Sequence, residues 1–357
     1  MSTKTLDPAL KSLLQSGTVL PAIPLALNSS RQFDEARQRG LARYYVATGA
    51  GGLAVAVHST QFEIRDPEIN LFETVLRVVS DEIDASKPGR PFIKIAGICG
   101  PTAQAVKEAE TALKYGFDLG LLSMGGLQSW TEKAILQRVR DVAAVMPVIG
   151  FYLQPSVGGR IFTYEFWQEF AEIKNIEAIK VAAFNRYQTL DVVRAVCASS
   201  RCNEIDLYTG NDDNIIPDLL TKYSFAINGK RVEKEFVGGL LGHWAVWTRA
   251  AVKLLEEIKA CKANGNKGIA ELLTKGIEVT DMNAAIFDPA NNFHGCIPGI
   301  HEVLRRQGLL EGRWCLNPQE ELSDGQMEEI DRVCKAYPHL IDDQFVKELL
   351  LAEFLSK

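Results

Sequence analysis

The feature that most constrains the fold is an alternation of short apolar runs with amphipathic segments, which continues without a break over about the first 265 residues. Short apolar runs bounded by turn residues are typical of buried strands, and apolar residues three or four apart are typical of helices. The sequence predicts strands at 17–27, 53–58, 91–97, 117–123, 147–152, 176–181, 205–209 and 236–241.

Eight strands that alternate with helices match a closed parallel barrel, since each right-handed crossover brings the next strand beside the last. We therefore predict a (β/α)8 TIM barrel over residues 1–265 and a carboxyl-terminal helical domain over 266–357. An open doubly wound sheet of the same strands is the alternative. Between the strands, the spacing predicts helices at 34–47, 71–86, 102–115, 131–145, 164–173, 189–197, 214–222 and from strand eight to about 263.

Composition excludes several classes of function. The 357 residues are 46% hydrophobic and 24% charged, with a net charge of −6 and no long block of one sign, so nucleic acid is not an expected partner. Apolar runs are interrupted well before the roughly 18 residues needed to span a bilayer, and the amino terminus has no apolar signal core. We expect a cytoplasmic protein that does not bind membranes.

Neither a metal nor a cofactor is predicted. The seven cysteines are scattered and form no C-x-x-C pair, which argues against a disulfide framework and against a zinc site. The glycines at 49–52 precede a predicted strand, whereas the glycines of a dinucleotide fingerprint follow one. His294, Cys296 and His301 have no spacing that a metal site requires, and Asp212 and Asp213 are explained equally well by a solvated turn.

Lys180 is the strongest candidate for a reactive side chain. It lies near the end of the apolar run 176–181, where a buried strand delivers its amine to the carboxyl end of the barrel. Burial lowers the pKa of an ammonium because its charged form loses more hydration than its neutral form, and the free amine can then attack a carbonyl. The alternative is an ordinary strand-terminal lysine that reaches solvent.

Active sites of such barrels lie at the carboxyl ends of the strands, where the loops converge. A lysine that forms an imine, a tyrosine and two hydroxyls that carry protons would make a coherent set there. The residues predicted at these ends are His58, Ser59, Thr60, Cys99, Gly100, Ser123, Tyr152, Lys180, the segment 210–213, and the segment from Leu241 to His243.

The order of segments resembles the dihydrodipicolinate synthase and N-acetylneuraminate lyase family of class I aldolases, lyases and dehydratases, over about residues 17–336. Tyr152 precedes Lys180 by 28 residues, as in that family. The segments that carry the resemblance are Val57-His-Ser-Thr60, Gly150-Phe-Tyr-Leu-Gln-Pro155, Ile176-Glu-Ala-Ile-Lys180, Tyr208-Thr-Gly-Asn-Asp-Asp213, Gly239-Leu-Leu-Gly242 and Ile297-Pro298 with the helix after it.

The resemblance implies an imine between Lys180 and the keto carbon of pyruvate or another 2-keto acid, with Tyr152 moving protons. Ser59 and Thr60 would bind the carboxylate of the keto acid and extend the proton relay. It also implies assembly as a homo-oligomer, a dimer or a tetramer. Further contacts to the substrate are expected from Arg160, which would bind an acidic distal group, and from Asn185, Gly210 and Leu241.

Departures from the family limit the prediction. A tyrosine pair expected after strand four is replaced by Ser123-Met-Gly-Gly-Leu127, and the residues after the lysine, 181–185, are largely apolar. These changes argue against the lysine-biosynthetic reaction and leave the second substrate undefined. Two other functions stay open: a family member that binds a small acid as a regulatory or structural protein, and a metal-dependent barrel hydrolase. Tyr152 as a packing residue and Ser59 and Thr60 as helix caps also stay open.

Overall fold

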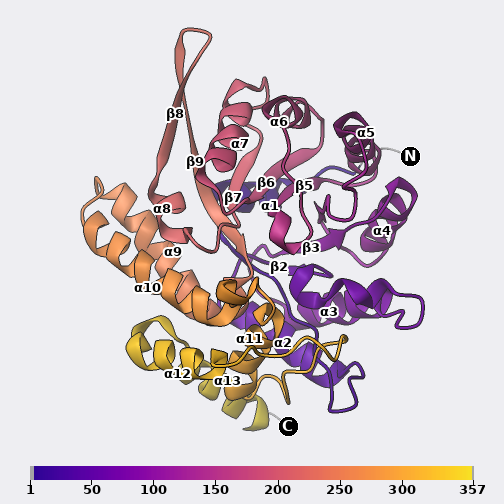
Figure 1. The fold of residues 1–357 in the computed structure, drawn as a ribbon, viewed down its shortest axis with the longest axis vertical. Helices are drawn as coiled ribbons and strands as arrows, with labels where there is room; N and C mark the ends of the chain where they lie inside the picture. The colour runs from indigo at the N-terminus through magenta and orange to yellow at the C-terminus, as the bar shows by residue number, and fades with distance from the viewer. Residues whose placement is uncertain (1–3, 356–357) are drawn as a thin grey trace. The chain divides into compact units, whose positions relative to one another are not determined.

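The computed structural model describes residues 4–355. Residues 1–3, part of the amino terminus predicted to lack a signal core, and residues 356–357 of the predicted helical domain lie outside the described residues. Eight parallel strands alternate with helices along the chain, and further helices follow them, so the fold is the predicted (β/α)8 barrel with a carboxyl-terminal helical extension (Figure 1). The chain divides into two compact units, Met1–Thr18 with Ile93–Leu240, and Val19–Phe92 with Leu241–Lys357.

The first unit contains six adjacent parallel strands, which alternate with helices in the manner that the sequence predicts. Their order in the sheet is β3-β4-β5-β6-β7-β9. Some helices of this unit begin at a capping residue. Thr131 and Thr163, for example, accept hydrogen bonds from backbone N–H groups in the first turns of α5 and α6. The strands are β3 (Ile93–Ile98), β4 (Leu119–Leu122), β5 (Val148–Leu153), β6 (Ile176–Ala182), β7 (Asp206–Thr209) and β9 (Lys230–Leu241), and the helices are α4 (Thr102–Lys114), α5 (Glu132–Ala143), α6 (Tyr164–Ala171), α7 (Arg186–Ala198) and α8 (Ile215–Leu220).

An amino-terminal helix, α1 (Pro8–Ser16), was not predicted. Asp7 caps it by accepting the N–H of Ala9 at 2.8 Å, and proline at the first helical position suits a helix start. The carbonyl of Leu14 accepts a hydrogen bond from Tyr208 of β7 at 2.7 Å. The segment therefore packs against the strands of the first unit.

Strand β6 carries one extra residue relative to β5. Val148 pairs with Ile176, but the next pair is Ile149 with Ala178, so Glu177 lies in a bulge. The buried carboxylate of Glu177 forms an ion pair with Lys11 of α1 at 3.0 Å. Because successive side chains of a strand point to opposite faces, the bulge decides which residue of β5 shares a face with each residue of β6 beyond it.

The structure also contains a β-hairpin that the sequence analysis missed. Strand β8 (Lys222–Ile227) pairs with β9 in antiparallel register, where a helix up to residue 222 and no strand before 236 had been expected. Asn228 and Gly229 both have positive φ angles, 50° and 75°, as a two-residue hairpin turn of type I′ requires. The Asn-Gly pair was therefore a usable signal, and Figure 1 shows the hairpin extending beyond the helices of the first unit.

The second unit contains two short parallel strands and the carboxyl-terminal helices. The strands lie side by side, since Gly51 donates its N–H to Val19 at 3.1 Å and Ile23 donates to Ala54 at 2.9 Å. Within the described residues, no helix is long and apolar enough to cross a bilayer. The elements of this unit are β1 (Val19–Pro21), β2 (Gly52–Val55), α2 (Glu35–Ala47), α3 (Phe72–Ser86), α9 (Thr248–Ala263), α10 (Ile269–Phe287), α11 (Cys296–Arg306), α12 (Gln326–Ala336) and α13 (Asp343–Leu355).

A buried carboxylate holds the helical extension together. The side chain of Glu302 on α11 is fully buried, and Arg305 and Arg306 each donate hydrogen bonds to it at 2.8 Å. Arg313 lies 3.5 Å from the other oxygen, and Arg306 also binds Asp331 of α12. Although burial alone would raise it, these arginine contacts lower the pKa of Glu302 to about 2. The charge is therefore retained, and it links α11 with α12 and with the loop between them.

Asp206 generates a prediction about stability. It begins β7 with its carboxyl group buried, and burial raises its pKa to about 6 against the opposing charges of Lys234 and Lys11. The folded state therefore binds a proton more tightly than the unfolded state, whose aspartate has a pKa of about 3.9. Stability from this group is present at low pH and is lost as the pH rises through about 6.

We expect Asp206→Asn, which is neutral at every pH, to gain stability relative to the wild type as the pH rises. The difference in the free energy of unfolding between variant and wild type should grow by about 2 kcal/mol between pH 4 and pH 7. Urea denaturation at several pH values measures it. A difference that does not change with pH would show that Asp206 has no raised pKa.

Candidate active site

Lys180 lies in β6 of the first unit with its side chain buried, 9% exposed. Burial lowers the pKa of its ammonium to about 8, and the carboxylate of Asp212 opposes this shift. The Nζ atom lies 4.2 Å from the centre of the Phe151 ring on β5, which is a cation–π contact. The structure therefore places the predicted nucleophile in a largely apolar environment with one carboxylate acting on it.

Tyr152 does not face Lys180. In the register that the bulge sets, Phe151 pairs with Lys180 and Tyr152 pairs with Val181, on the other face of the sheet. The Tyr152 ring packs against Trp167 of α6, with centroids 5.2 Å apart, and burial raises the pKa of its phenol to about 12. The expectation that Tyr152 moves protons at Lys180 thus finds no support in the geometry, while the packing role that stayed open agrees with it.

Gly210 is next to the lysine, as its predicted place after β7 suggested. A Cβ atom on Gly210 would lie 2.7 Å from Cε of Lys180 and 2.8 Å from Cβ of Ala182, distances that real Cβ contacts do not reach. Only glycine leaves room for the lysine stem at this point. Asp212 follows in the same loop and is buried, so the solvated turn considered from the sequence is wrong for this residue.

Two residues predicted to bind substrate make contacts within the protein. The Nη1 atom of Arg160 donates to backbone carbonyls in the loop after β4, at 2.7 Å to Trp130 and 3.3 Å to Leu127. Asn185 caps α7, because its side chain accepts the N–H of Gln188 at 3.2 Å. These contacts give both residues structural roles, and binding of a distal substrate group stays a prediction.

The hydroxyls of Ser59 and Thr60 lie in the second unit, in a short turn after β2. Both side chains are buried, and both donate to the segment that follows β1. Ser59 is 3.1 Å from the carbonyl of Ala22, and Thr60 is 2.7 Å from the carbonyl of Ile23. Their hydroxyl protons are therefore engaged with the backbone. Leu241, the remaining predicted contact, ends β9 and is buried.

His243 and the metal-binding candidates provide no further catalytic group. His243 is buried beside Trp247, with ring centroids 6.0 Å apart, and burial lowers its pKa to about 4. His243, which the sequence places after strand eight, thus lies in the environment of a core residue. Within residues 4–355, no group of three or more histidine, cysteine, aspartate or glutamate side chains is placed to hold a metal ion.

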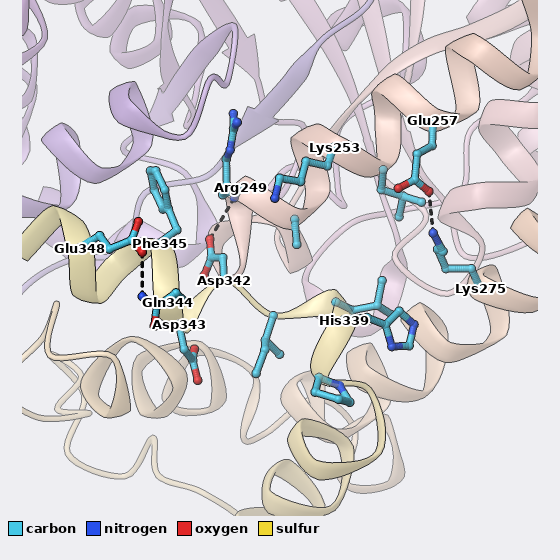
Figure 2. Close-up of a pocket in the computed structure, with 15 residues that line it drawn as sticks. Arg249, Lys253, Glu257, Lys275, His339, Asp342, Asp343, Gln344, Phe345 and Glu348 are labelled. Carbon is cyan, nitrogen blue, oxygen red and sulfur yellow. Dashed lines mark hydrogen bonds and ion pairs between the residues drawn. The ribbon is translucent and has the colours of Figure 1, made fainter.

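A cavity of about 670 Å³ lies in the second unit, between α9, α10 and α13 (Figure 2). No residue of the predicted site lines it. Several of its charged groups are already paired with one another or with nearby polar groups, as Lys275 is with Glu257 at 2.5 Å and the N–H of Arg249 is with Asp342 at 3.0 Å.

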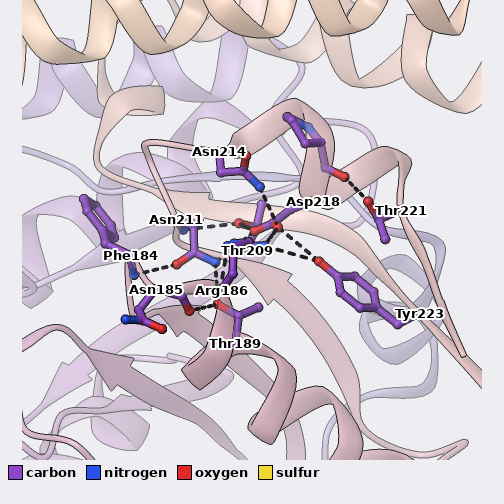
Figure 3. A network of polar contacts seen from close by, with 11 residues as sticks. Phe184, Asn185, Arg186, Thr189, Thr209, Asn211, Asn214, Asp218, Thr221 and Tyr223 are labelled. Carbon is purple, nitrogen blue, oxygen red and sulfur yellow. Dashed lines mark hydrogen bonds and ion pairs between the residues drawn. The ribbon is translucent and has the colours of Figure 1, made fainter. Parts of the chain in front are cut away.

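Two features of the site were not predicted from the sequence. Phe151 stands beside Tyr152 in the segment that resembles the family and was given no role there, and a polar network around Asp218 was not recognised, since its members are ordinary helix, strand and loop residues (Figure 3). Asp212 lay within the predicted segment 210–213, where a solvated turn was an equal alternative. The aspartate at 218 gave one signal, because a charged residue within the apolar run 215–220 needs partners when the run is buried.

Comparison with known proteins identifies distant relatives. No protein-family model matches the chain. A 4-hydroxy-tetrahydrodipicolinate synthase of Caldicellulosiruptor bescii is 33% identical over 149 residues, which are 41% of this chain and 46% of that protein. The match thus spans about half the length of this curated relative. Six further curated matches carry the same name.

Solved structures show the same fold. Dihydrodipicolinate synthase from Oceanobacillus iheyensis superimposes with a TM-score of 0.71 at 16% identity, covering 90% of this chain and 96% of that one. N-acetylneuraminate lyase from Fusobacterium nucleatum superimposes with a TM-score of 0.68 at 18% identity, covering 90% and 99%. These likenesses confirm the barrel and its carboxyl-terminal helices.

Gly210→Ala tests the packing at the lysine. The new methyl group must displace Lys180 or Ala182, so we expect a loss of about 2 kcal/mol in the free energy of unfolding. We also expect a changed rate of Lys180 acetylation by acetic anhydride, read by mass spectrometry. Gly40→Ala on α2 is the control, since its methyl group meets only an arginine nitrogen at 3.8 Å. Equal behaviour of the two variants would contradict the close approach of Gly210.

Proposed function

We propose that this chain, a distant relative of the dihydrodipicolinate synthase and N-acetylneuraminate lyase family, is a class I lyase that forms an imine between Lys180 and a 2-keto acid. One observation carries the proposal. Lys180 is a buried strand lysine whose pKa is lowered to about 8, so roughly a tenth of its amine is free at pH 7. Pyruvate and 2-keto-3-deoxy sugar acids are the substrate class that the resemblance suggests.

The chemistry needs no metal. The free amine adds to the keto carbon, the resulting carbinolamine loses water, and a protonated imine remains on Lys180. In the cleavage direction a base takes the proton of the C4 hydroxyl as the electrons of the bond between C3 and C4 move into the imine, which leaves an enamine on the lysine and releases an aldehyde. Protonation at C3 and hydrolysis then release pyruvate and restore the amine. The synthetic direction reverses these steps. In a dehydratase the C3–C4 bond stays intact: a base removes a proton from C3 to form the enamine, and the hydroxyl group on C4 then leaves with a proton as water.

Asp212 is proposed as the group that handles protons at the imine. It is buried, and it is the charged group that raises the pKa of Lys180 against the effect of burial. A carboxylate at this place can take the proton that the attacking amine releases and return it when water leaves. Phe151 contributes a different effect, because its ring face stabilises the positive charge that the ammonium and the protonated imine share.

Ser59 and Thr60 remain part of the proposal through the resemblance. In this proposal they bind the carboxylate of the keto acid. Their hydroxyls must then break the hydrogen bonds that they donate to the backbone carbonyls of Ala22 and Ile23. The proposal also includes a dimer or tetramer in the cytoplasm. The reaction of lysine biosynthesis is not proposed, since the segment from Val181 to Phe184 is apolar.

Reductive trapping tests the imine. Sodium borohydride with pyruvate should add the mass of a reduced pyruvate adduct to the peptide that contains Lys180. The trapping rate should rise with pH through about 8, since only the neutral amine attacks. Lys94, also a buried lysine on a strand of the first unit, is an internal control and should stay unmodified.

The trapping experiment also separates the alternatives. Lys180→Ala should abolish the adduct, and an adduct that persists in this variant would place the chemistry elsewhere. Absence of an adduct with every keto acid in a panel of 2-keto and 2-keto-3-deoxy acids would overturn the proposed mechanism. If a keto acid raised the melting temperature without an adduct or turnover, a regulatory protein would be the better description.

The role of Tyr152 gives a second test. Because its ring lies on the face opposite Lys180, we expect Tyr152→Phe to trap pyruvate within about twofold of the wild-type rate. Asp212→Asn should behave differently, since loss of its charge lowers the pKa of Lys180 and shifts the pH midpoint of trapping below that of the wild type. A large loss of trapping in Tyr152→Phe with unchanged stability would return Tyr152 to the reaction.

A further inference from the structure

Two loops flank Lys180 in the first unit, and one side chain joins them. Residues 183–185 follow β6 and lead into α7, and residues 210–214 follow β7 and lead into α8. The side-chain oxygen of Asn211 accepts the N–H of Phe184 at 2.9 Å. Its amide nitrogen donates to Asp218 at 2.9 Å and lies 3.3 Å from Thr189. Asn211 is fully buried, so its amide is a bridge between the loops inside the protein.

Asp218 anchors this bridge. Its carboxylate is completely buried and is surrounded by donors from α7, β7, β8 and the loop between β7 and α8 (Figure 3). A buried charge of this kind is tolerated only when it is paired and hydrogen-bonded. The donors are the Arg186 guanidinium, the Thr209 hydroxyl at 2.7 Å, the Asn211 amide at 2.9 Å, the Asn214 amide at 3.1 Å and the Tyr223 hydroxyl at 3.2 Å.

The backbone at Phe184 is an independent sign that this loop is held in place. Phe184 has a φ angle of 49°, in the left-handed region that a bulky residue rarely adopts. Such a conformation is unfavourable and persists only where the surrounding structure holds it in place. The hydrogen bond from its N–H to the Asn211 side chain holds the Phe184 backbone in this conformation. Phe184 comes four residues after Lys180. Strain of this kind clusters at functional sites.

We propose that Asn211 is a positioning residue for the imine site: its buried amide, anchored on Asp218, holds the Phe184 loop and the adjoining Asp212 in place around Lys180. Asn211 is next to Asp212 in the chain, and its own N–H is fixed by the Thr209 hydroxyl at 3.2 Å. The side chain acts through Asp212 and Phe184 and does not itself touch the substrate. The predicted effect of Asn211 on turnover rests on the proposed function. The hydrogen bonds that hold the two loops do not depend on it.

The test compares two asparagines that donate to the same carboxylate. Asn211→Ala removes the bridge, whereas Asn214→Ala removes one donor to Asp218 and leaves the contact with Phe184 intact. We expect Asn211→Ala to slow pyruvate trapping at Lys180 by about tenfold or more, because misplaced reacting groups lose rate steeply. Asn214→Ala should trap within about threefold of the wild type, with a similar loss of melting temperature.

A second readout does not depend on any keto acid. Reductive methylation with ¹³C-formaldehyde labels the lysines, and NMR titration then follows the Lys180 signal. Asn211→Ala should lower the pKa of Lys180 by about half a unit, because the Asp212 carboxylate that raises it is no longer held in place. Asn214→Ala should leave the titration unchanged.

These outcomes separate the two proposals. If the wild type forms no adduct but Asn211→Ala alone shifts the Lys180 titration, the proposed function fails and the positioning role stands. Equal trapping rates and equal titrations in the two variants overturn the positioning role, whatever the reaction is. Should Asn211→Ala not fold by circular dichroism, Asn211→Gln keeps the amide but moves it by one methylene group, and the same comparison with Asn214→Ala applies.

Discussion

The buried carboxylate of Asp218 is the constraint on which the candidate site depends. Because the protein interior solvates a charge poorly, the chain must bring donors to this carboxylate, and these donors come from α7, β7, β8 and the loop between β7 and α8. The ends of these elements are the loops that flank Lys180. Satisfying one charge therefore orders the segments on which imine chemistry would rely, and the hairpin strand β8 takes part through Tyr223.

The lysine itself is subject to two opposing electrostatic effects. Burial favours the neutral amine, and the Asp212 carboxylate favours the ammonium, with a resulting pKa of about 8. A more apolar site would hold more free amine but would lack a group to handle protons, and a stronger carboxylate contact would keep the lysine charged. The missing side chain of Gly210 suits the same balance, since it leaves room for the lysine side chain without adding a polar group.

The strands and most helices could be predicted because apolar runs and helical periodicity are local signals. The face of the sheet on which the Tyr152 side chain lies could not be predicted in this way. Its spacing of 28 residues from Lys180 equals that of the first pair in the register, Val148 with Ile176, so an unbroken ladder would place Tyr152 beside Lys180. The bulge at Glu177 shifts this pairing by one residue. The bulged residue is paired with Lys11, a residue far away in the sequence, and no local pattern contains that contact.

The same shift in register limits which residue roles can be transferred from the family. Motif order places residues on strands, but a residue acts only if its side chain faces the site, and one inserted residue reverses the face of those beyond it. Here the reversal puts a phenylalanine beside the lysine in place of a tyrosine, which is why the proposed proton carrier is Asp212, in the loop after β7. Its carboxylate raises the pKa of the amine. Chemistry shared with the family would then be maintained by different residues on a common barrel.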